Sequence, residues 1–220
     1  MRFSRVGSVK KSFARQGEKI KTIAIIGLGC VGSRTAAKLS RKFKGKAKLL
    51  LVDFDSVTIE NLGCQLYDSK DYNAKKAVAT ALKTGGKAVI KKITSKNAFA
   101  LLKNADVIAD CTDDWQARKT IDDFCAHARK PWVYSGALGT QAMVGTITLP
   151  GFFAKWAKKT PRVSCHEFGI STKACEWAAK TQEKEVARLI EGKKPKLSQK
   201  IAFCDIKTNE KTIVEIKNSA

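Results

Sequence analysis

A glycine-rich turn between an apolar run and a helical segment constrains the fold of this chain more than any other feature. Ile23–Ile26 is apolar, and the turn Gly27-Leu28-Gly29-Cys30-Val31-Gly32 follows it directly. Apolar residues then recur at helical spacing between positions 35 and 43. Glycines let a backbone pass close to phosphates, and the N-terminus of a helix offers unpaired N–H groups to an anion. The pattern therefore predicts a buried strand, a nucleotide-binding turn and a helix.

Apolar runs and helical segments keep alternating after this turn. The pattern predicts further strands and a helix in alternation, as a doubly wound sheet requires. We expect strands over 49–53, 88–93, 107–110 and 132–135 and a helix over 75–83. The predicted fold class is α/β, a Rossmann-like, mostly parallel sheet.

The last third of the chain has a different pattern. Val144–Leu149 is β-rich, and Ser171–Ile190 has the apolar spacing of an amphipathic helix. Ile201–Cys204 and Thr212–Ile216 flank a polar stretch and predict a C-terminal β-hairpin. We expect a basic lead-in over 1–21 and a single nucleotide-binding domain over 22–220. A crossover loop is expected over about 151–170.

The formal net charge of +22 attracts polyanions, whether RNA, ATP or an acidic partner protein. The lysines are spread along the chain with few aromatic residues among them, so a solvated lysine-rich surface explains the charge equally well. No apolar run approaches the roughly 18 residues of a membrane span, and the first residues lack the apolar core of a signal peptide. A cytoplasmic protein without a membrane partner is expected.

Cysteine and histidine usage argues against two kinds of structural staple. The seven cysteines are an odd number without a C-x-x-C pair, and there are two histidines. Neither a disulfide framework nor a structural zinc site is expected from this pattern. Cys111, Cys125, Cys175 and Cys204 fall in predicted strands or helices and are expected to be core residues.

A row of polar residues after the second predicted strand separates two nucleotide chemistries. The glycine turn and Asp53 alone fit an NAD enzyme as well as an ATP enzyme. Hydride transfer gives no role to Asn61, Gln65 and Lys76, whereas phosphate activation needs amides and a lysine around the phosphates. Three carboxylates within residues 110–114 add oxygen ligands of the kind that Mg²⁺ prefers.

The order of these motifs resembles the ThiF/MoeB/HesA family, the relatives of ubiquitin-activating enzymes. That family shows G-x-G-x-x-G, then D-x-D-x-V-x-x-x-N-L-x-R-Q, then D-x-G-x-x-K, then D-x-T-D-N-x-x-x-R, and the match runs from about residue 2 to residue 216. The resemblance implies an adenylyltransferase that uses ATP and Mg²⁺. Its substrate would be the C-terminal glycine carboxylate of a small ubiquitin-like (β-grasp) sulfur-carrier protein ending in Gly-Gly. It also implies a homodimer.

The resemblance assigns roles to individual positions. Lys76 would contact the phosphates, Asp113 would bind Mg²⁺ or orient the attacking carboxylate, and Arg118 matches the arginine after T-D-N. Arg5 would reach into the partner subunit's site, unless it is one more basic residue of the N-terminal segment. The nucleotide would be held by Gly27, Gly29, Gly32, Asp53, Asn61, Gln65 and Lys76.

Four positions depart from the family pattern. Cys64 replaces a phosphate-binding arginine, Cys30 and Asn73 stand where glycine is common, and Asp114 replaces asparagine. Losing one charge-assisted contact weakens binding by about 1.5–3 kcal/mol. A non-catalytic relative is therefore one alternative reading.

The segment Ser164–Ile170 resembles the family's cysteine-containing segment before its last large helix. Cys165, with His166 beside it, is a candidate nucleophile for an acyl adenylate. A loop cysteine without a covalent role fits the segment equally well, since several family members need adenylation alone.

Two further activities remain open at this stage. The charge of +22 suits ATP-dependent activation of a carboxylate on modified tRNA, as in threonylcarbamoyladenosine dehydratase-like relatives. An NAD-dependent oxidoreductase explains the glycine turn and Asp53 but leaves Lys76 and Asp113 without a role.

Overall fold

Eight strands form one sheet in a computed structural model that describes residues 21–148 and 169–216. The order across the sheet is β3-β2-β1-β4-β5-β6-β7-β8. The strands are β1 (Lys21–Ile26), β2 (Ala47–Val52), β3 (Lys87–Val89), β4 (Val107–Asp110), β5 (Trp132–Leu138), β6 (Gln141–Ile147), β7 (Lys200–Asp205) and β8 (Lys211–Glu215).

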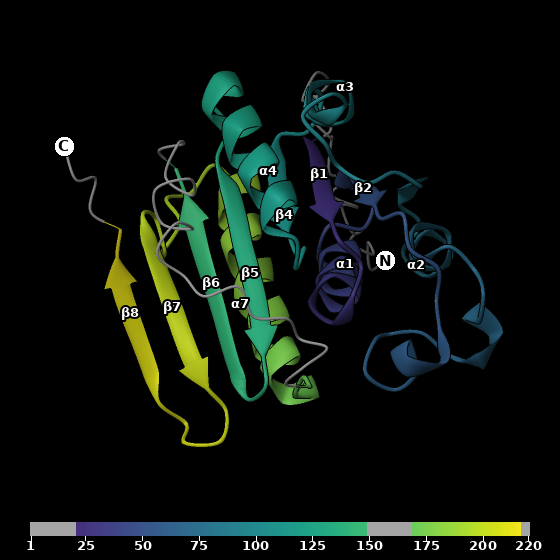
Figure 1. Ribbon diagram of the computed structural model, residues 1–220. Coiled ribbons are helices and arrows are strands. Elements are labelled where there is room, and N and C mark those ends of the chain that lie inside the picture. The colour runs from purple at the N-terminus through teal and green to yellow at the C-terminus, as the bar shows by residue number, and fades with distance from the viewer. Residues whose placement is uncertain (1–20, 149–168, 217–220) are drawn as a thin grey trace, which may run out of the picture.

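Strands β1 to β5 run parallel, and β6, β7 and β8 continue the sheet in antiparallel pairs. Figure 1 shows the C-terminal β7–β8 hairpin at one edge of this sheet. The order reverses at β1, because the chain leaves β3 at one edge and returns to β4 on the other side of β1. The predicted fold class, with its C-terminal hairpin, is confirmed.

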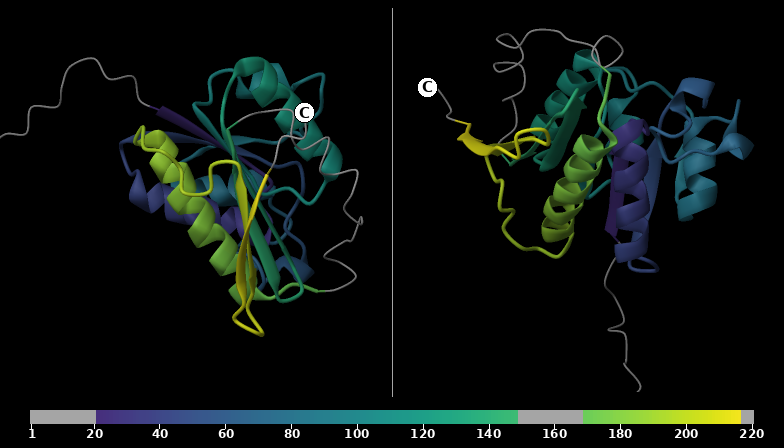
Figure 2. Two further views of the ribbon diagram at one scale, coloured as in Figure 1. Left: turned by 90° about the vertical axis from the view of Figure 1, so that its left-hand side faces the viewer. Right: turned by 90° about the horizontal axis from the view of Figure 1, so that it is seen from below.

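Helices cover both faces of the sheet (Figures 1 and 2). Apolar side chains of α1 (Cys30–Lys42), α2 (Lys76–Thr84) and α7 (Thr172–Ile190) pack on one face. Those of α3 (Ala98–Leu102) and α4 (Trp115–Ala128) pack on the other. Two short 3₁₀ turns, η1 (Ile59–Asn61) and η2 (Ser69–Asp71), lie between β2 and α2.

Strand β3 is shorter than the sequence predicts. The apolar pattern predicted a strand over 88–93, but pairing with β2 ends where Val89 faces Val52, the last residue of β2. Beyond that point no neighbouring strand among the described residues is available to accept hydrogen bonds. Lys91, Lys92 and Ile93 instead line the cavity described below.

A buried glutamine on α7 links this helix both to the sheet and to the adjacent helix α1. The Gln182 amide group donates to the carbonyl oxygens of Asp110 (3.0 Å) and Val133 (2.9 Å). Its oxygen accepts hydrogen bonds from the Thr35 hydroxyl (2.8 Å) and the Cys111 thiol (3.1 Å). A buried polar group must be satisfied in this way to avoid a large desolvation cost. Gln182 therefore fixes α7 against β4, β5 and α1.

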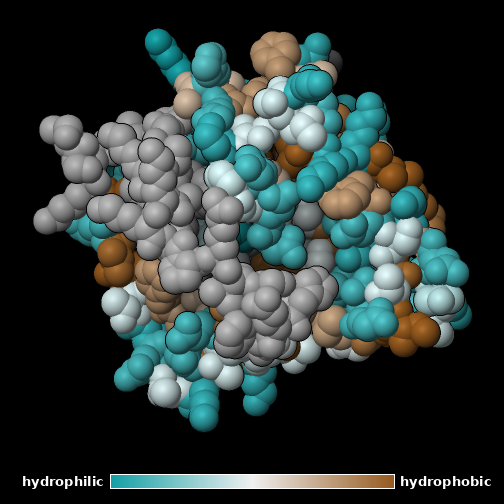
Figure 3. Space-filling view, in the orientation of Figure 1, coloured by the Kyte–Doolittle hydropathy of each residue, from teal (hydrophilic) through white to brown (hydrophobic). Residues whose placement is uncertain are grey.

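Hydrophilic side chains predominate on the face of the molecule that Figure 3 shows, and most cysteines of the described ranges are buried. Figure 3 shows mostly hydrophilic side chains on one face, with apolar ones scattered between them. In the described ranges no helix has the length and apolar character needed to cross a bilayer. The six cysteines of these ranges are free thiols, and Cys125, Cys175 and Cys204 are buried as predicted.

Replacing Gln182 with leucine should destabilise the fold by about 2–4 kcal/mol, because four buried hydrogen bonds are lost at a net value of about 1 kcal/mol each. Urea unfolding measures this loss. Lys184→Leu, at an exposed position of the same helix, is the matched control and should change stability by less than about 0.5 kcal/mol. Equal stability of the two variants would contradict the role given to Gln182.

Candidate nucleotide-binding site

The glycine turn is packed backbone against backbone. A Cβ atom on Gly32 would lie 1.9 Å from the Gly27 carbonyl oxygen, and one on Gly27 would lie 2.8 Å from the Cys111 carbonyl oxygen. Gly27 also has a φ of +81°, a conformation that other residues rarely adopt. Around Gly29 a Cβ atom would meet nothing within 4 Å. Gly27 and Gly32 are thus required by packing, whereas Gly29 borders open space at the start of α1.

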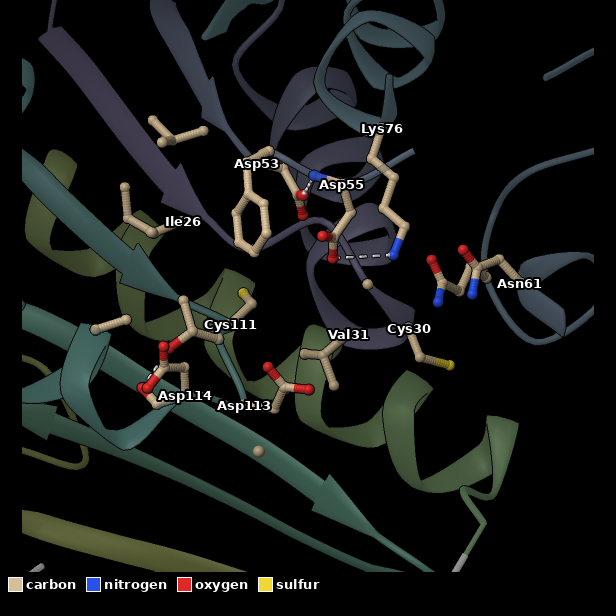
Figure 4. A pocket seen from close by; sticks show the side chains of 18 of the residues that line it. Ile26, Cys30, Val31, Asp53, Asp55, Asn61, Lys76, Cys111, Asp113 and Asp114 are labelled. Carbon is tan, nitrogen blue, oxygen red and sulfur yellow. Dashed lines mark hydrogen bonds and ion pairs between the residues drawn. The ribbon is translucent and has the colours of Figure 1, made fainter. Parts of the chain in front are cut away.

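A cavity of about 900 Å³ opens beside this turn. It lies beyond the carboxyl ends of β1 and β4, where the strand order reverses and ligands bind in folds of this kind. Figure 4 shows side chains from separate segments converging on it. They come from the turns after β1, β2 and β4, from η1 and from the start of α2, so residues far apart in sequence share one cavity.

Asp53 lies directly after β2 and holds the glycine turn in place. Its carboxylate accepts hydrogen bonds from the backbone N–H groups of Leu28 (2.6 Å) and Asp55 (2.8 Å). Burial raises the pKa of this carboxyl, and the two hydrogen bonds oppose the rise. Asp53 lines the cavity as the sequence predicts, and it also has a structural role that the sequence analysis did not identify.

Lys76 begins α2 and extends toward the cavity, where its ammonium group lies 3.6 Å from an oxygen of Asp55 (Figure 4). Its side chain is 10% exposed, so the charge is held in a confined space. The Lys76 N–H also donates to the Asp55 carbonyl oxygen at 2.9 Å. The sequence analysis did not identify Asp55 as the partner of Lys76, although the D-x-D motif places Asp55 two residues after Asp53.

Asn61 and Gln65 line the cavity on the side of η1. The Asn61 side-chain oxygen accepts a hydrogen bond from the Thr58 N–H at 3.2 Å and caps the 3₁₀ turn. The buried side-chain oxygen of Gln65 has no hydrogen-bond partner among the described residues. Since buried polar atoms are nearly always satisfied, this acceptor oxygen calls for a hydrogen-bond donor.

Position 64, where the family carries an arginine, contributes mainly its backbone. The Arg34 guanidinium donates to the carbonyl oxygens of Cys64 (2.8 Å) and Cys30 (2.8 Å) and is buried. It therefore ties the segment after η1 to the first turn of α1. Arg34 does not line the cavity, so it stabilises the site without replacing the missing phosphate contact.

The three carboxylates after β4 do not converge on one point. Asp110 is fully buried and accepts hydrogen bonds from the N–H and hydroxyl groups of Thr112. Asp114 caps α4 through the Gln116 N–H (2.8 Å) and pairs with Lys92 at 2.9 Å. Figure 4 shows the Asp113 carboxylate extending into the cavity, which Asp110 does not line.

Asp110 and Arg118 hold the turn that presents Asp113. The Arg118 guanidinium lies 3.7 Å from the Asp110 carboxylate, donates to the Thr112 carbonyl oxygen and stacks on the Tyr134 ring. Burial raises the pKa of Asp110 to about 6, and the Arg118 charge opposes this rise. Arg118, which matches the family's arginine in the sequence, thus positions the turn that carries Asp113.

A single carboxylate fits a magnesium ion that is shared with a nucleotide. Among the described residues no group of three or more His, Cys, Asp or Glu is arranged to hold a metal ion. Mg²⁺ commonly uses one or two carboxylates together with substrate phosphates. Asp113 therefore fits Mg²⁺ bound with ATP, and the idea that three carboxylates share the ion does not fit.

The remaining expectations concern Cys111, Asn73 and three residues outside the described ranges. Cys111 was predicted in a strand, but it follows β4 and lines the cavity, half-buried. Burial raises its pKa to about 12, so it is a poor nucleophile. Asn73 adopts a φ of +63°, which explains why it can stand at a glycine position. Arg5, Cys165 and His166 lie outside the described residues.

The cavity continues from the nucleotide turn toward the end of β5. Gly136, Ala137 and Gly169 line this arm together with Ile170. The arm is held by backbone hydrogen bonds from the Gly139 N–H to the Gly169 carbonyl (3.1 Å) and from the Ser171 N–H to the Gly139 carbonyl (2.8 Å). Its small residues leave room for a narrow, extended group.

Comparisons with solved structures agree with this fold. The selenomethionine crystal structure of PaaA superimposes with a TM-score of 0.73 at 20% identity, covering 89% of this chain and 64% of that one. The crystal structure of Escherichia coli MccB with ATP gives a TM-score of 0.73 at 15% identity, covering 90% and 64%.

Curated relatives show higher sequence identity. The vegetative HesA protein of Trichormus variabilis is 28% identical over 160 residues, which are 69% of this chain and 57% of HesA. Ubiquitin-like modifier-activating enzyme 5 of Gallus gallus is 29% identical over 185 residues, 73% of this chain and 46% of that enzyme. The adenylyltransferase and sulfurtransferase MOCS3 of Drosophila ananassae is 29% identical over 143 residues, 60% of this chain and 31% of MOCS3.

The chain thus spans about a third to rather more than half of the length of these relatives. The ThiF family itself matches residues 11–220, nearly the whole sequence. This match, and the motifs that the fold brings together around the glycine turn, place the chain in the ThiF family.

Proposed function

We propose that this chain uses ATP to adenylate the C-terminal glycine carboxylate of a small ubiquitin-like carrier protein that delivers sulfur. The observation that supports this most strongly is the single cavity shared by Gly29, Asn61, Lys76 and Asp113. A catalyst of phosphate activation needs such a set of donors and charges around one site.

The arrangement of the cavity suggests how ATP would lie. Open space at Gly29 and the N-terminus of α1 suit phosphate oxygens. Lys76 would neutralise their charge, and Asn61 and Gln65 would contact them through amide groups. The Asp53 carboxylate, already oriented by two backbone N–H groups, would accept hydrogen bonds from ribose hydroxyls. Nothing in this arrangement calls for a nicotinamide.

Magnesium would bind at Asp113 together with the phosphates. When bound, it would offset the negative charge that repels an incoming carboxylate. The rest of the work belongs to the protein. Lys76 and the N–H groups of the turn stabilise the charge that develops on the departing pyrophosphate.

The reaction needs no general base, because a peptide C-terminal carboxylate is ionised at neutral pH. A carboxylate oxygen attacks the α-phosphorus of ATP. The bond between the α-phosphorus and the oxygen that bridges it to the β-phosphate breaks, and pyrophosphate leaves with the electron pair of that bond. The product is an acyl adenylate. The enzyme contributes mainly by holding two anions in line, and positioning of this kind is worth several kcal/mol of the barrier.

The carrier as substrate is supported by the arm toward β5. Its small lining residues, Gly136, Ala137 and Gly169, leave room for an extended Gly-Gly tail. Relatives named adenylyltransferase and sulfurtransferase, and another named ubiquitin-like modifier-activating enzyme, favour a carrier protein. Escherichia coli MccB, which shares this fold, has been crystallised with MccA, so other partners of this fold are the comparison for a test of the carrier.

Lys76→Ala and Asp113→Ala should each lower ATP–pyrophosphate exchange by about 100-fold or more, because the first removes the cation beside the phosphates and the second removes the carboxylate that would hold Mg²⁺. Lys75→Ala and Asp123→Ala are matched controls, since both residues lie outside the cavity lining. Melting temperatures of all four variants would verify folding. Exchange at the wild-type rate in either site variant would sink the assignment of that residue.

The exchange rate should fall as the pH drops through about 6, because protonation of Asp110 removes its ion pair with Arg118 and loosens the turn that presents Asp113. The raised pKa means that folded protein binds this proton more tightly than unfolded chain does. Acidification through this window therefore stabilises the fold through Asp110, so unfolding at this group does not explain the fall.

The control for this pH dependence is a pair of substitutions measured from pH 5 to pH 8. Asp110→Asn should be slow throughout and lack the fall near pH 6. Asp106→Asn, at the opposite end of the parallel strands, should retain it. An unchanged pH profile in Asp110→Asn would exclude Asp110 as its source.

Cys165→Ala should leave ATP–pyrophosphate exchange unchanged, because adenylation precedes any thioester or acyl-disulfide step. If Cys165 is the nucleophile, this variant should accumulate carrier adenylate without a covalent enzyme–carrier adduct, which intact-protein mass spectrometry detects. An adduct that persists in the variant would assign the nucleophile to another residue.

A further inference from the structure

Strand β8 ends the sheet with an edge that no described strand covers. Its five residues, Lys211–Glu215, are all exposed, and among the described strands it pairs with β7 alone. Figures 1 and 2 show it at the outer side of the antiparallel part of the sheet. An exposed edge of this kind offers backbone N–H and C=O groups to another strand. None of the five residues lines the cavity, so the nucleotide-binding role does not account for this edge.

The two edges of the sheet differ in how well they are protected against pairing. Strand β3, at the opposite edge, has three residues and begins with Lys87. A short strand and a lysine are both features that keep a sheet edge from pairing with another chain. Strand β8 instead exposes two large apolar side chains, since Ile213 is 60% exposed and Val214 is 49% exposed. Residues of this β-branched type favour strand pairing, so β8 is the edge suited to accept a further strand.

The hydrogen bonds between β7 and β8 show which residues of β8 face outward. Just after β8, the Ile216 N–H donates to the Gln199 carbonyl oxygen at 2.8 Å. In an antiparallel pair, residues whose N–H and C=O groups face the neighbour alternate with residues whose groups face away from it. The even-numbered positions of β8 therefore face β7. Lys211, Ile213 and Glu215 direct their backbone groups away from β7, toward the outer edge.

The sequence of β8 is complementary to itself in antiparallel pairing. Ile213 lies at its centre, and the end residues, Lys211 and Glu215, carry opposite charges. A two-fold axis at Ile213 therefore sets Lys211 opposite Glu215 of a second copy at both ends of the contact. With one lysine and one glutamate, β8 is also formally neutral, whereas the whole chain has a net charge of +22. Two copies can thus approach at β8 with less repulsion than at a lysine-rich surface.

We propose that β8 pairs antiparallel with β8 of a second copy of this chain, about a two-fold axis at Ile213. The two Ile213 residues exchange backbone N–H···O=C bonds, and the two sheets continue as one. Lys211 and Glu215 form an ion pair between the copies at each end. Glu215 also lies 2.8 Å from Lys200 of its own chain, but its side chain is 65% exposed and a carboxylate accepts more than one donor.

The contact is symmetric and small. Because the same residues of both copies meet across the axis, the pairing closes on a dimer. Only the five residues of β8 take part on each side, so the dimer is weak and depends on concentration. The contact does not include the cavity, so this inference goes beyond the proposed function and does not rest on it.

Analytical ultracentrifugation of the full chain over a range of concentrations tests the charge pairing. Lys211→Glu and Glu215→Lys should each raise the Kd of the dimer about tenfold or more, because like charges then lie opposite each other at both ends. An equal mixture of the two variants should restore association, since every cross-strand pair then joins opposite charges. Lys207→Glu, in the exposed turn before β8, makes the same charge change and should associate like the wild-type protein.

The mixture separates lost pairing from damage to the fold, because a second chain does not repair a misfolded strand. A mixture that associates no more tightly than either variant alone would overturn the proposal. So would a Kd in Lys211→Glu equal to that of the wild-type protein.

An introduced cysteine tests the position of the axis. Ile213→Cys should give a covalent dimer on mild oxidation, because Cα atoms of a hydrogen-bonded antiparallel pair lie about 5.5 Å apart, within reach of a disulfide. Val214→Cys is the matched control on the other face of β8. It would lie opposite Thr212 of the second copy and about 7–8 Å from its own counterpart, so it should cross-link much more slowly. The wild-type protein shows what the native cysteines contribute.

Absence of a covalent dimer from Ile213→Cys, or equal cross-linking rates for the two cysteine variants, would overturn the proposal. Hydrogen exchange at the β8 amides identifies the occupant of the edge. Exchange should slow as the concentration of the chain rises. Exchange that slows only when a Gly-Gly carrier is added would assign the edge to the carrier and overturn the pairing of two copies. None of these readouts requires ATP or adenylation, so failure of the proposed function is distinguishable from failure of this inference.

Discussion

Close backbone packing between the turn after β1 and the turn after β4 is the constraint on which the site depends. Gly27 contacts the Cys111 carbonyl so closely that a Cβ atom has no room, and Gly32 lies in the same way against Gly27. This contact brings the start of α1 beside Asp113. The parallel strands β1 and β4 deliver both turns to one edge of the sheet, where the cavity opens.

Buried polar groups then fix the turns that the glycines bring together. Gln182 reaches from α7 to Asp110 and Cys111, while Asp53 holds the backbone at Leu28. Gln182 is satisfied within the protein and is not available to a ligand, whereas Asp53 also lines the cavity and the Gln65 oxygen has no partner among the described residues. Residues that hold the walls of the cavity in place can thus be distinguished from residues that would contact a ligand bound in it.

Much of the fold and of the cavity lining could be predicted from the sequence, because the periodicity of apolar residues and the positions of glycines determine local structure. The strand over 107–110 has the bounds expected, and Asp53, Asn61, Gln65, Lys76 and Asp113 line one cavity as the motif order suggested. Helix α4 was not predicted, although Ala117, Ile121 and Phe124 have helical spacing. The end of β3 was not predictable, since it depends on where its neighbour β2 stops.

Partnerships across the fold were the part that sequence reasoning missed. Asp55 with Lys76, Lys92 with Asp114, and Arg34 with Cys64 join residues that no local pattern relates. These partnerships change the reading of single motifs. Asp114, which departs from the family asparagine, caps a helix and binds a lysine, so it leaves Asp113 as the carboxylate directed into the cavity.

ATP–pyrophosphate exchange by the wild-type protein, with and without small β-grasp proteins that end in Gly-Gly, tests most directly whether this cavity activates a carrier's carboxylate with ATP. Exchange is expected to appear with a carrier and to disappear when the carrier's terminal glycine is removed. Absence of exchange with every such carrier, together with tight and salt-sensitive binding of tRNA, would rule out this function.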